Sequence, residues 1–206
     1  MGIAFLTGFL LGLSLIVAIG AQNTFVLRQG IIGKHIFYVA LFCALSDALL
    51  ICIGIAGISF FLDNLFSQIS NWLFGLSAIW LLGYGVLRLK SVFKEDIILE
   101  IEMSSSKSLL STLSMVSILT FANPHVYLDT MILIGSVSQQ FVNIEKLFFT
   151  FGASLASFVF FFSLAYGAKL LQPIMKEPSA WRILDCFIAI IMFTIALKLL
   201  IEGNWI

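Results

Sequence analysis

Apolar residues along the chain come in six long runs, separated by short stretches of polar and charged residues. A helix needs about 20 predominantly apolar residues to cross the hydrocarbon core of a bilayer. The runs cover approximately residues 2–27, 36–62, 71–89, 109–137, 147–171 and 181–201. The pattern therefore predicts an all-α polytopic membrane protein, with six transmembrane segments in a single transmembrane domain.

Two of these runs are interrupted by polar residues. The first changes character at Gly20-Ala21-Gln22-Asn23, where two side-chain amides stand among apolar residues. The fourth is longer than one span needs and holds Asn123-Pro124 near its middle. Proline removes a backbone donor and clashes with the preceding helical turn. We therefore expect broken helices in segments one and four, marked by Gly20 and Pro124. The sequence leaves open whether each broken segment crosses the membrane fully.

The two halves of the chain resemble each other. Leu45-Ser46-Asp47 and Leu155-Ala156-Ser157 occupy corresponding places in the middle segment of each half, and the third segments begin with Trp72 and Trp181. With the two interruptions, these matches predict a duplicated three-helix unit whose second copy is inverted in the membrane. The first repeat, the central cytoplasmic connection and the second repeat would cover about 1–90, 91–108 and 109–206. Inverted repeats with interrupted helices at matching places indicate the binding site of a secondary transporter.

The composition supports a membrane protein and excludes several other classes. The chain is 61% hydrophobic and 11% charged, whereas about a quarter of the residues in a soluble domain are charged. A formal net charge of zero argues against a nucleic-acid partner. Cys43, Cys52 and Cys186 lie in apolar runs without CxxC spacing, which is typical of small buried hydrophobes and not of metal ligands. The chain contains no catalytic or nucleotide-binding motif, so we expect neither an enzyme nor a cofactor.

The basic residues predict the orientation in the membrane. Nine of them lie on or beside the loops that join segments one to two, three to four and five to six, and only Lys146 and Lys198 fall on the other side. The nine are Arg28, Lys34, Arg88, Lys90, Lys94, Lys107, Lys169, Lys176 and Arg182. Cytoplasmic loops carry an excess of lysine and arginine. We therefore expect those three loops to be cytoplasmic and both termini to be external.

Asp47 and Asp129 are the acids placed well inside apolar segments. An ionised group that faces lipid is very costly, so intramembrane acids mark functional sites by default. The functional hypothesis is that both carboxylates attract a cation, or take up and release a proton during transport. The structural alternative is that either acid sits at the headgroup level or caps a helix break.

Other polar side chains near the breaks have two possible roles. Gln22, Asn23 and Asn123 could satisfy backbone groups freed by a break, or could hydrogen-bond a substrate. We group Tyr127, from the same polar stretch as Asn123, with these candidate substrate-binding residues. His125 is a candidate proton relay, although a lone histidine is more often structural.

Asp185 lies near the start of segment six, three residues after Arg182. Residues three apart on a helix are neighbours on one face. We therefore expect these two side chains to form a local ion pair at the cytoplasmic boundary.

Three stretches carry a family resemblance. IGAQNTFVLRQG at 19–30, LSDALLICIGIAG at 45–57 and NPHVYLDT at 123–130 resemble the LysE family of amino-acid exporters, most closely its lysine and arginine exporter branch. The resemblance covers essentially the full chain, although Ala21 stands where members of the family often have proline. It implies a multi-pass exporter of basic amino acids in the bacterial inner membrane, driven by an ion gradient.

The leading hypothesis is therefore a secondary exporter of L-lysine or L-arginine that works by alternating access. Its expected partners are the amino acid, a coupling ion such as the proton, and the lipid bilayer. The sequence leaves open whether copies of the chain associate into a homo-oligomer. The alternatives are an exporter of neutral amino acids, of another small metabolite or of a metal cation, and a membrane subunit that transports nothing.

Overall fold

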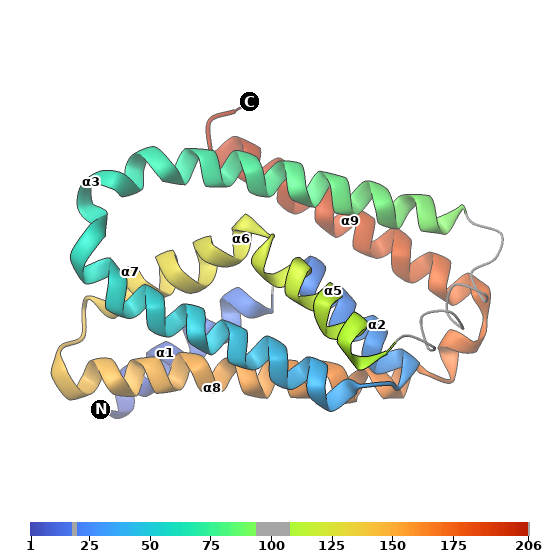
Figure 1. The fold of residues 1–206 in the computed structure, drawn as a ribbon, viewed down its shortest axis with the longest axis horizontal. Coiled ribbons are helices and arrows are strands. Elements are labelled where there is room, and N and C mark those ends of the chain that lie inside the picture. Colours follow the sequence, from blue (N-terminus) through green and yellow to red (C-terminus); the bar gives the residue numbers. More distant parts are fainter. Residues whose placement is uncertain (18–19, 94–107, 206) are drawn as a thin grey trace.

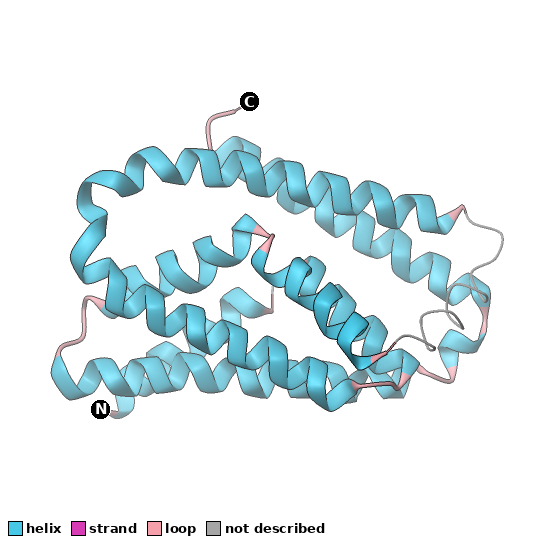
Figure 2. Cartoon of the chain, viewed as in Figure 1, coloured by secondary structure: helices cyan, strands magenta, loops and turns pink. Residues whose placement is uncertain are grey.

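A computed structural model describes the backbone of residues 1–17, 20–93 and 108–205, and every regular element in those ranges is a helix (Figures 1 and 2). The predicted all-α class is confirmed for these residues. Most of the predicted connection at 91–108 lies outside them. The helices in chain order are α1 (Gly2–Ile16), α2 (Ala21–Ile32), α3 (Ile36–Val92), α5 (Leu109–Phe121), α6 (Pro124–Tyr127), the π-helix η1 (Leu128–Leu133), α7 (Ile134–Ser138), α8 (Asn143–Gly167), the 3-10 helices η2 (Ala168–Leu171) and η3 (Ile174–Lys176), and α9 (Pro178–Glu202).

Several of these helices are long and apolar enough to cross a membrane. In the described residues, three spans meet this test by themselves: Ile36–Gly57 within α3, Asn143–Leu171 and Pro178–Glu202. Two bent pairs, α1 with α2 and α5 with residues 125–138, raise the number to as many as five. The sixth expected segment, at 71–89, forms the later part of α3 and is not among these spans. The arrangement of six spans as inverted repeats therefore stays a prediction.

Helix α3 covers two of the expected segments. We expected separate helices at 36–62 and 71–89, but the backbone is helical from Ile36 to Val92. The ribbon of α3 curves and reverses its direction, so that both of its ends lie to the right of the bend in Figure 1. The expected reversal is present, whereas the expected break in the helix is not. A continuous helix satisfies its own backbone groups, which a loop in an apolar environment could not do.

Helices from the two halves of the chain pack against each other. Helix α1 lies along α8, and α3 lies along both α8 and α9. Small residues allow close helix packing in α1, where a Cβ atom at Gly8 would overlap the carbonyl oxygen of Phe149. The core is therefore built between the halves and not within each half separately.

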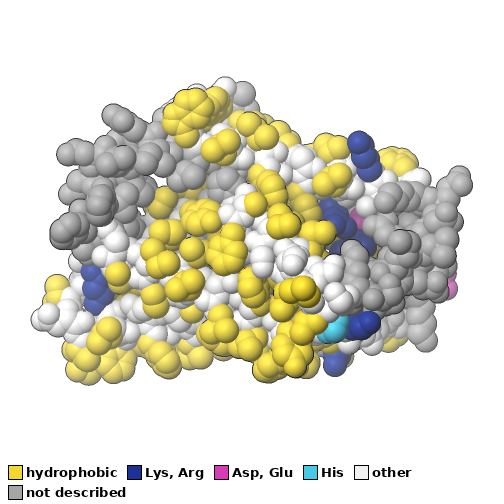
Figure 3. Space-filling model, in the orientation of Figure 1, with side chains coloured by type: hydrophobic (Ala, Val, Ile, Leu, Met, Phe, Trp, Pro, Cys, Tyr) yellow, Lys and Arg dark blue, Asp and Glu magenta, His cyan; other side chains and the backbone are white. Residues whose placement is uncertain are grey.

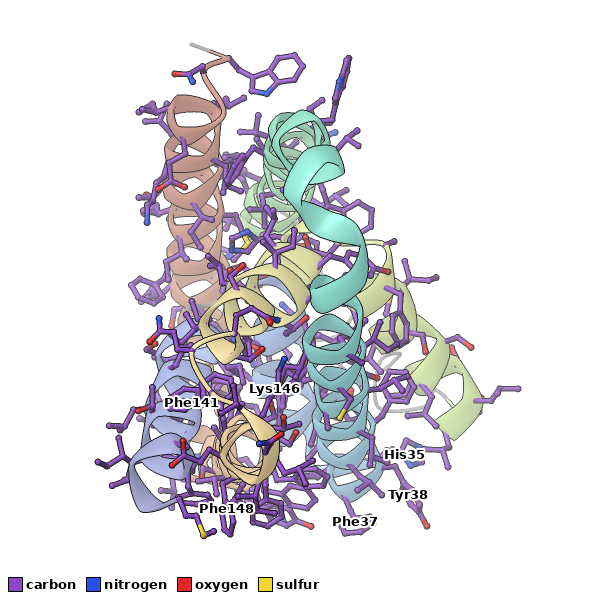
Figure 4. All side chains as sticks on the ribbon, turned by 90° about the vertical axis from the view of Figure 1, so that its left-hand side faces the viewer. His35, Phe37, Tyr38, Phe141, Lys146 and Phe148 are labelled. Carbon is purple, nitrogen blue, oxygen red and sulfur yellow. The ribbon has the colours of Figure 1, made fainter. Side chains whose placement is uncertain are left out.

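The outer surface of the bundle is largely apolar. Phe37, Tyr38 and Phe148 are exposed on α3 and α8, and all three lie near the lower edge of the view in Figure 4. Apolar side chains cover much of the broad face in Figure 3, and most of the visible basic side chains lie toward its right-hand end. An apolar belt with charge concentrated at one end is what a lipid bilayer requires of a spanning bundle.

Candidate functional site

The first helix break places two amide side chains next to the end of α1. Helix α1 ends at Ile16, and α2 begins at Ala21 after Gly20, whose backbone is extended. The two helices are bent by 81° relative to each other. The Nδ2 amide of Asn23 donates a hydrogen bond of 2.7 Å to the carbonyl oxygen of Ile16, one of the carbonyls that a helix end leaves without a helical partner. Asn23 thus satisfies a backbone group that the break frees.

The second break is built in a similar way. Helix α5 ends at Phe121 and α6 begins at Pro124, a position where the missing N–H of proline leaves no hydrogen bond unmade. The backbone N–H of His125 donates to Oδ1 of Asn123 at 3.2 Å. Asn123 is buried. It therefore caps the new helix and, like Asn23, holds the broken backbone in place.

Asp129 lies in the π-helix η1, directly after this second break. A π-helix inserts an extra residue into a turn, and such turns occur frequently at functional sites. Oδ2 of Asp129 lies 3.3 Å from Nε2 of His125, and the Thr130 hydroxyl donates to the carbonyl oxygen of Val126 at 2.6 Å. From the sequence we expected only a break at the proline, and not this π-helical turn.

Helix α3 brings the second acid to the same region. It packs against η1 so closely that a Cβ atom at Gly54 would lie 2.5 Å from Cα of Met131. Asp47, about two turns before Gly54, is only 3% exposed. Among the described residues, neither Oδ1 of Asp47 nor Nε2 of Gln22 has a hydrogen-bond partner. Because buried polar atoms are nearly always paired, these two atoms are candidates for contact with a ligand.

Both acids and both breaks border one cavity of about 50 Å³, which we call the central cavity. About 10–15 Å³ of such space is enough for one water molecule, so this cavity has room for water and is small for an amino acid. The residues that line it are Leu15, Ile16, Gly20, Gln22, Asn23, Asp47, Asn123, His125, Val126, Asp129, Thr130 and Phe161. Helices α3 and η1 and both of the interrupted segments therefore border the same cavity.

A second, larger cavity adjoins the first. It measures about 630 Å³, and we call it the vestibule. His125, Asp129 and Leu15 line both cavities. On the side of α9, the vestibule is bordered by residues of the last helical turns, among them Lys198 and Glu202. The shared residues make the two cavities direct neighbours.

A cluster of ion pairs lies toward the opposite end of α9. Nη1 of Arg28 lies 2.5 Å from Oδ1 of Asp185, and Nη1 of Arg88 lies 3.7 Å from the same oxygen. Asp185 is buried, whereas Arg182 is exposed. The expected local pair of Arg182 with Asp185 is therefore wrong. Asp185 faces inward toward α2 and α3, because a buried carboxylate needs partners from neighbouring helices.

Aromatic rings complete this cluster. The guanidinium carbon of Arg28 lies 5.1 Å from the centre of the Trp181 ring, and that of Arg88 lies 4.9 Å from the centre of the Tyr84 ring. Arginine above an aromatic face is a favourable cation–π arrangement. The cluster joins α2, α3 and α9 into one packed layer.

The LysE type translocator family matches residues 13–203. Arginine exporter protein ArgO of Pectobacterium carotovorum is 38% identical over 202 residues, which are 97% of each chain. The chain belongs to the LysE family. ArgO of Pectobacterium atrosepticum is 36% identical over 98% of this chain and 99% of its own, and ArgO of Salmonella enteritidis is 37% identical over 95% and 92%, respectively. No solved structure matches the chain. The resemblance inferred from the three sequence stretches is confirmed, and the family is one of translocators and not of enzymes.

In this LysE-family chain, most of the expected site residues border the central cavity, but Tyr127 does not. The Tyr127 hydroxyl donates a hydrogen bond of 2.8 Å to the carbonyl oxygen of Phe121, at the end of α5. Tyr127 is not among the described residues that line either cavity. The structure therefore gives this side chain a place in the second break and not in the cavity.

The sequence also missed residues that the LysE-family fold brings to these regions. Thr130 and Phe161 line the central cavity, and Arg28 and Arg88 meet at Asp185. Asp185 stands among apolar residues in the sequence, but no sequence pattern pairs it with Arg28 or Arg88, which lie far away along the chain. Among the described residues, no group of three His, Cys, Asp or Glu side chains is arranged to hold a metal ion.

Proposed function

We propose that this protein exports basic L-amino acids, L-arginine in the first place and L-lysine with it, across the bacterial cytoplasmic membrane. The observation that carries the proposal is the meeting of Asp47 and Asp129 at one cavity. A substrate with a positive side chain and a positive α-amino group needs two negative partners when it leaves water. The similarity to several arginine exporters supports the same assignment.

The two broken helices serve the α-carboxylate of the substrate. Gln22 and Asn23 lie in the first turn of α2, and Asn123 caps α6. Helix N-termini carry partial positive charge and free N–H groups, which favour a carboxylate. We assign the substrate α-carboxylate to this pair of helix starts, and its positive groups to the two acids.

Export against a gradient requires coupling, for which we propose the proton. Asp47 and Asp129 alternate between substrate and proton, and His125 extends the path from Asp129 toward the vestibule, since it borders both cavities. The 3.3 Å between Nε2 of His125 and Oδ2 of Asp129 is slightly longer than the distance of about 2.6–3.2 Å needed for proton transfer, so a small approach of the two side chains would let a proton pass.

The order of three features along the bundle supports alternating access. The vestibule gives room on one side of the central cavity, and the layer formed by Arg28, Asp185 and Arg88 closes the other side. Arg28 lies about 9 Å beyond Gln22 along α2, because a helix rises about 1.5 Å per residue. We assign the closed side to the cytoplasm, where most of the basic residues are expected, and the vestibule to the exterior.

Efflux of labelled L-arginine from loaded membrane vesicles tests the proposal. The full chain should release arginine faster than vesicles without it, lysine should compete, and neutral amino acids should not. Effective competition by leucine or alanine would favour the neutral amino-acid alternative. A total lack of substrate-dependent flux, together with no thermal shift on addition of arginine or lysine, would favour a subunit that transports nothing.

A further inference from the structure

The vestibule has the size and the charges of a second amino-acid site. The central cavity of about 50 Å³ is too small for an amino acid, whereas the vestibule of about 630 Å³ falls within the usual range for small-molecule pockets, about 300–1,000 Å³. In the conformation described, a substrate therefore has room in the vestibule and not at Asp47.

Three charged side chains border this space. Asp129 lies at its inner end, beside the central cavity, and Lys198 and Glu202 border it from α9. Nζ of Lys198 lies 3.6 Å from Oε1 of Glu202, and Asp129 borders the same space. The three charged groups therefore face one cavity.

The signs of these charges complement a basic amino acid. Such a molecule carries one negative carboxylate and two positive groups, while the vestibule offers one positive lysine and two negative carboxylates. Phe74 and Ile195 supply apolar wall between the charges, against which the methylene stem of the side chain can pack. A neutral amino acid would leave one of the carboxylates without a partner.

The Lys198–Glu202 pair can exchange its partners easily. The two side chains are four residues apart on the surface of α9, with 72% and 46% of their areas exposed. Exposed pairs of this kind contribute little to stability. A ligand can therefore take over both groups without the loss of a contact on which the fold depends.

We propose that the vestibule is a release-side binding site for a basic amino acid, in which Lys198 binds the α-carboxylate and Asp129 with Glu202 bind the positive groups. This inference rests on the proposed export function. It adds Lys198 and Glu202, which the sequence patterns did not single out as site residues. The substrate passes from the central cavity to the vestibule by way of Asp129 and His125, which border both.

Calorimetric titration of the purified full chain with L-arginine and with agmatine tests the role of Lys198. Agmatine is arginine without its carboxylate, so it retains the positive groups and loses the partner of Lys198. Lys198→Gln should weaken arginine binding roughly tenfold, as for the loss of a charge-assisted hydrogen bond, and should not weaken agmatine binding. Lys198→Arg keeps the positive charge and should therefore retain most of the affinity for arginine.

Lys146→Gln is the matched control, because Lys146 lies near the start of α8 and does not border the vestibule (Figure 4). It should leave the binding of both ligands unchanged. Equal weakening of arginine and agmatine by Lys198→Gln, or no weakening of either, would overturn the vestibule site. If the unmodified protein exports arginine in either of those cases, the proposed function stands and only this inference fails.

Discussion

Nη1 of Arg28 lies 2.5 Å from Oδ1 of Asp185, which joins α2 in the first half of the chain to α9 in the second. Both side chains are mostly buried, with exposures of 13% and 3%. Asp185 and Lys198 are about 20 Å apart along α9, since a helix rises about 1.5 Å per residue. The ion pair therefore lies well away from the vestibule, on the far side of the central cavity.

Loss of this pair should destabilise the protein. Asp185→Asn leaves two buried guanidinium groups without their carboxylate, and breaking a buried ion pair in this way costs about 3–5 kcal/mol. Thermal unfolding in detergent should show a clear fall in Tm. Glu177→Gln, an exposed acid close to the start of α9, should leave Tm unchanged. Equal Tm values for Asp185→Asn and the unmodified protein would show that the pair contributes nothing to the fold.

The same substitution should open the closed side of the central cavity. Thr24 is fully buried on α2, between the cavity and Arg28. In a background without native cysteines, Thr24→Cys should react slowly with a hydrophilic maleimide added from the cytoplasmic side. Addition of Asp185→Asn should raise that rate several-fold, because the layer above Thr24 has lost its central charge. An unchanged rate in a variant that remains folded would contradict the role of this layer as a gate.

The two acids of the central cavity should be essential for flux and not for folding. Asp47→Asn and Asp129→Asn keep the side-chain shape and remove the charge. Each should reduce arginine efflux about 10- to 100-fold, because a hydrogen bond to a charged group contributes about 1.5–3 kcal/mol. Glu145→Gln serves as the control in the vesicle assay, because Glu145 is an exposed acid that pairs with the N-terminal amino group. Normal efflux by both aspartate variants would refute the roles assigned to them.

Asn23 should contribute more to stability than a typical polar residue. Asn23→Ala removes the donor to the carbonyl oxygen of Ile16, and a buried acceptor without a partner costs about 1–3 kcal/mol. The Tm should fall accordingly, while Gln140→Ala, at an exposed position, should have no effect. If Asn23→Ala lowered efflux at an unchanged Tm, its main role would be in binding substrate and not in repair of the break.

The contact between α1 and α8 should tolerate no side chain at Gly8. A Cβ atom there meets backbone, which cannot move aside as a flexible side chain could. Gly8→Ala should therefore destabilise the protein by about 1–3 kcal/mol, as overpacking does. Gly83→Ala is the matched control, because its Cβ atom would meet nothing within 4 Å. Similar Tm values for the two variants would mean that α1 is free to shift along α8.

The candidate site was partly predictable from single residues, because polar groups in apolar runs are costly wherever the chain places them. Asp47, Asp129 and the amides at the two breaks stood out for that reason, and the structure brings them to one cavity. Tyr127 stood out equally but bonds to the backbone at the break. Local sequence cannot distinguish these two outcomes, because both satisfy the same polar group.

The sequence by itself determined the helical class, the apolar segments, the positions of both breaks and the family. These features depend on local composition: runs of apolar residues form membrane helices, and proline or clustered polar residues interrupt them. Only the tertiary structure decided that α3 continues through its bend, that η1 is a π-helix, and that Asp185 pairs with Arg28. Each of these depends on contacts between segments far apart in the chain, where the burial of a charge or a backbone group selects its partner.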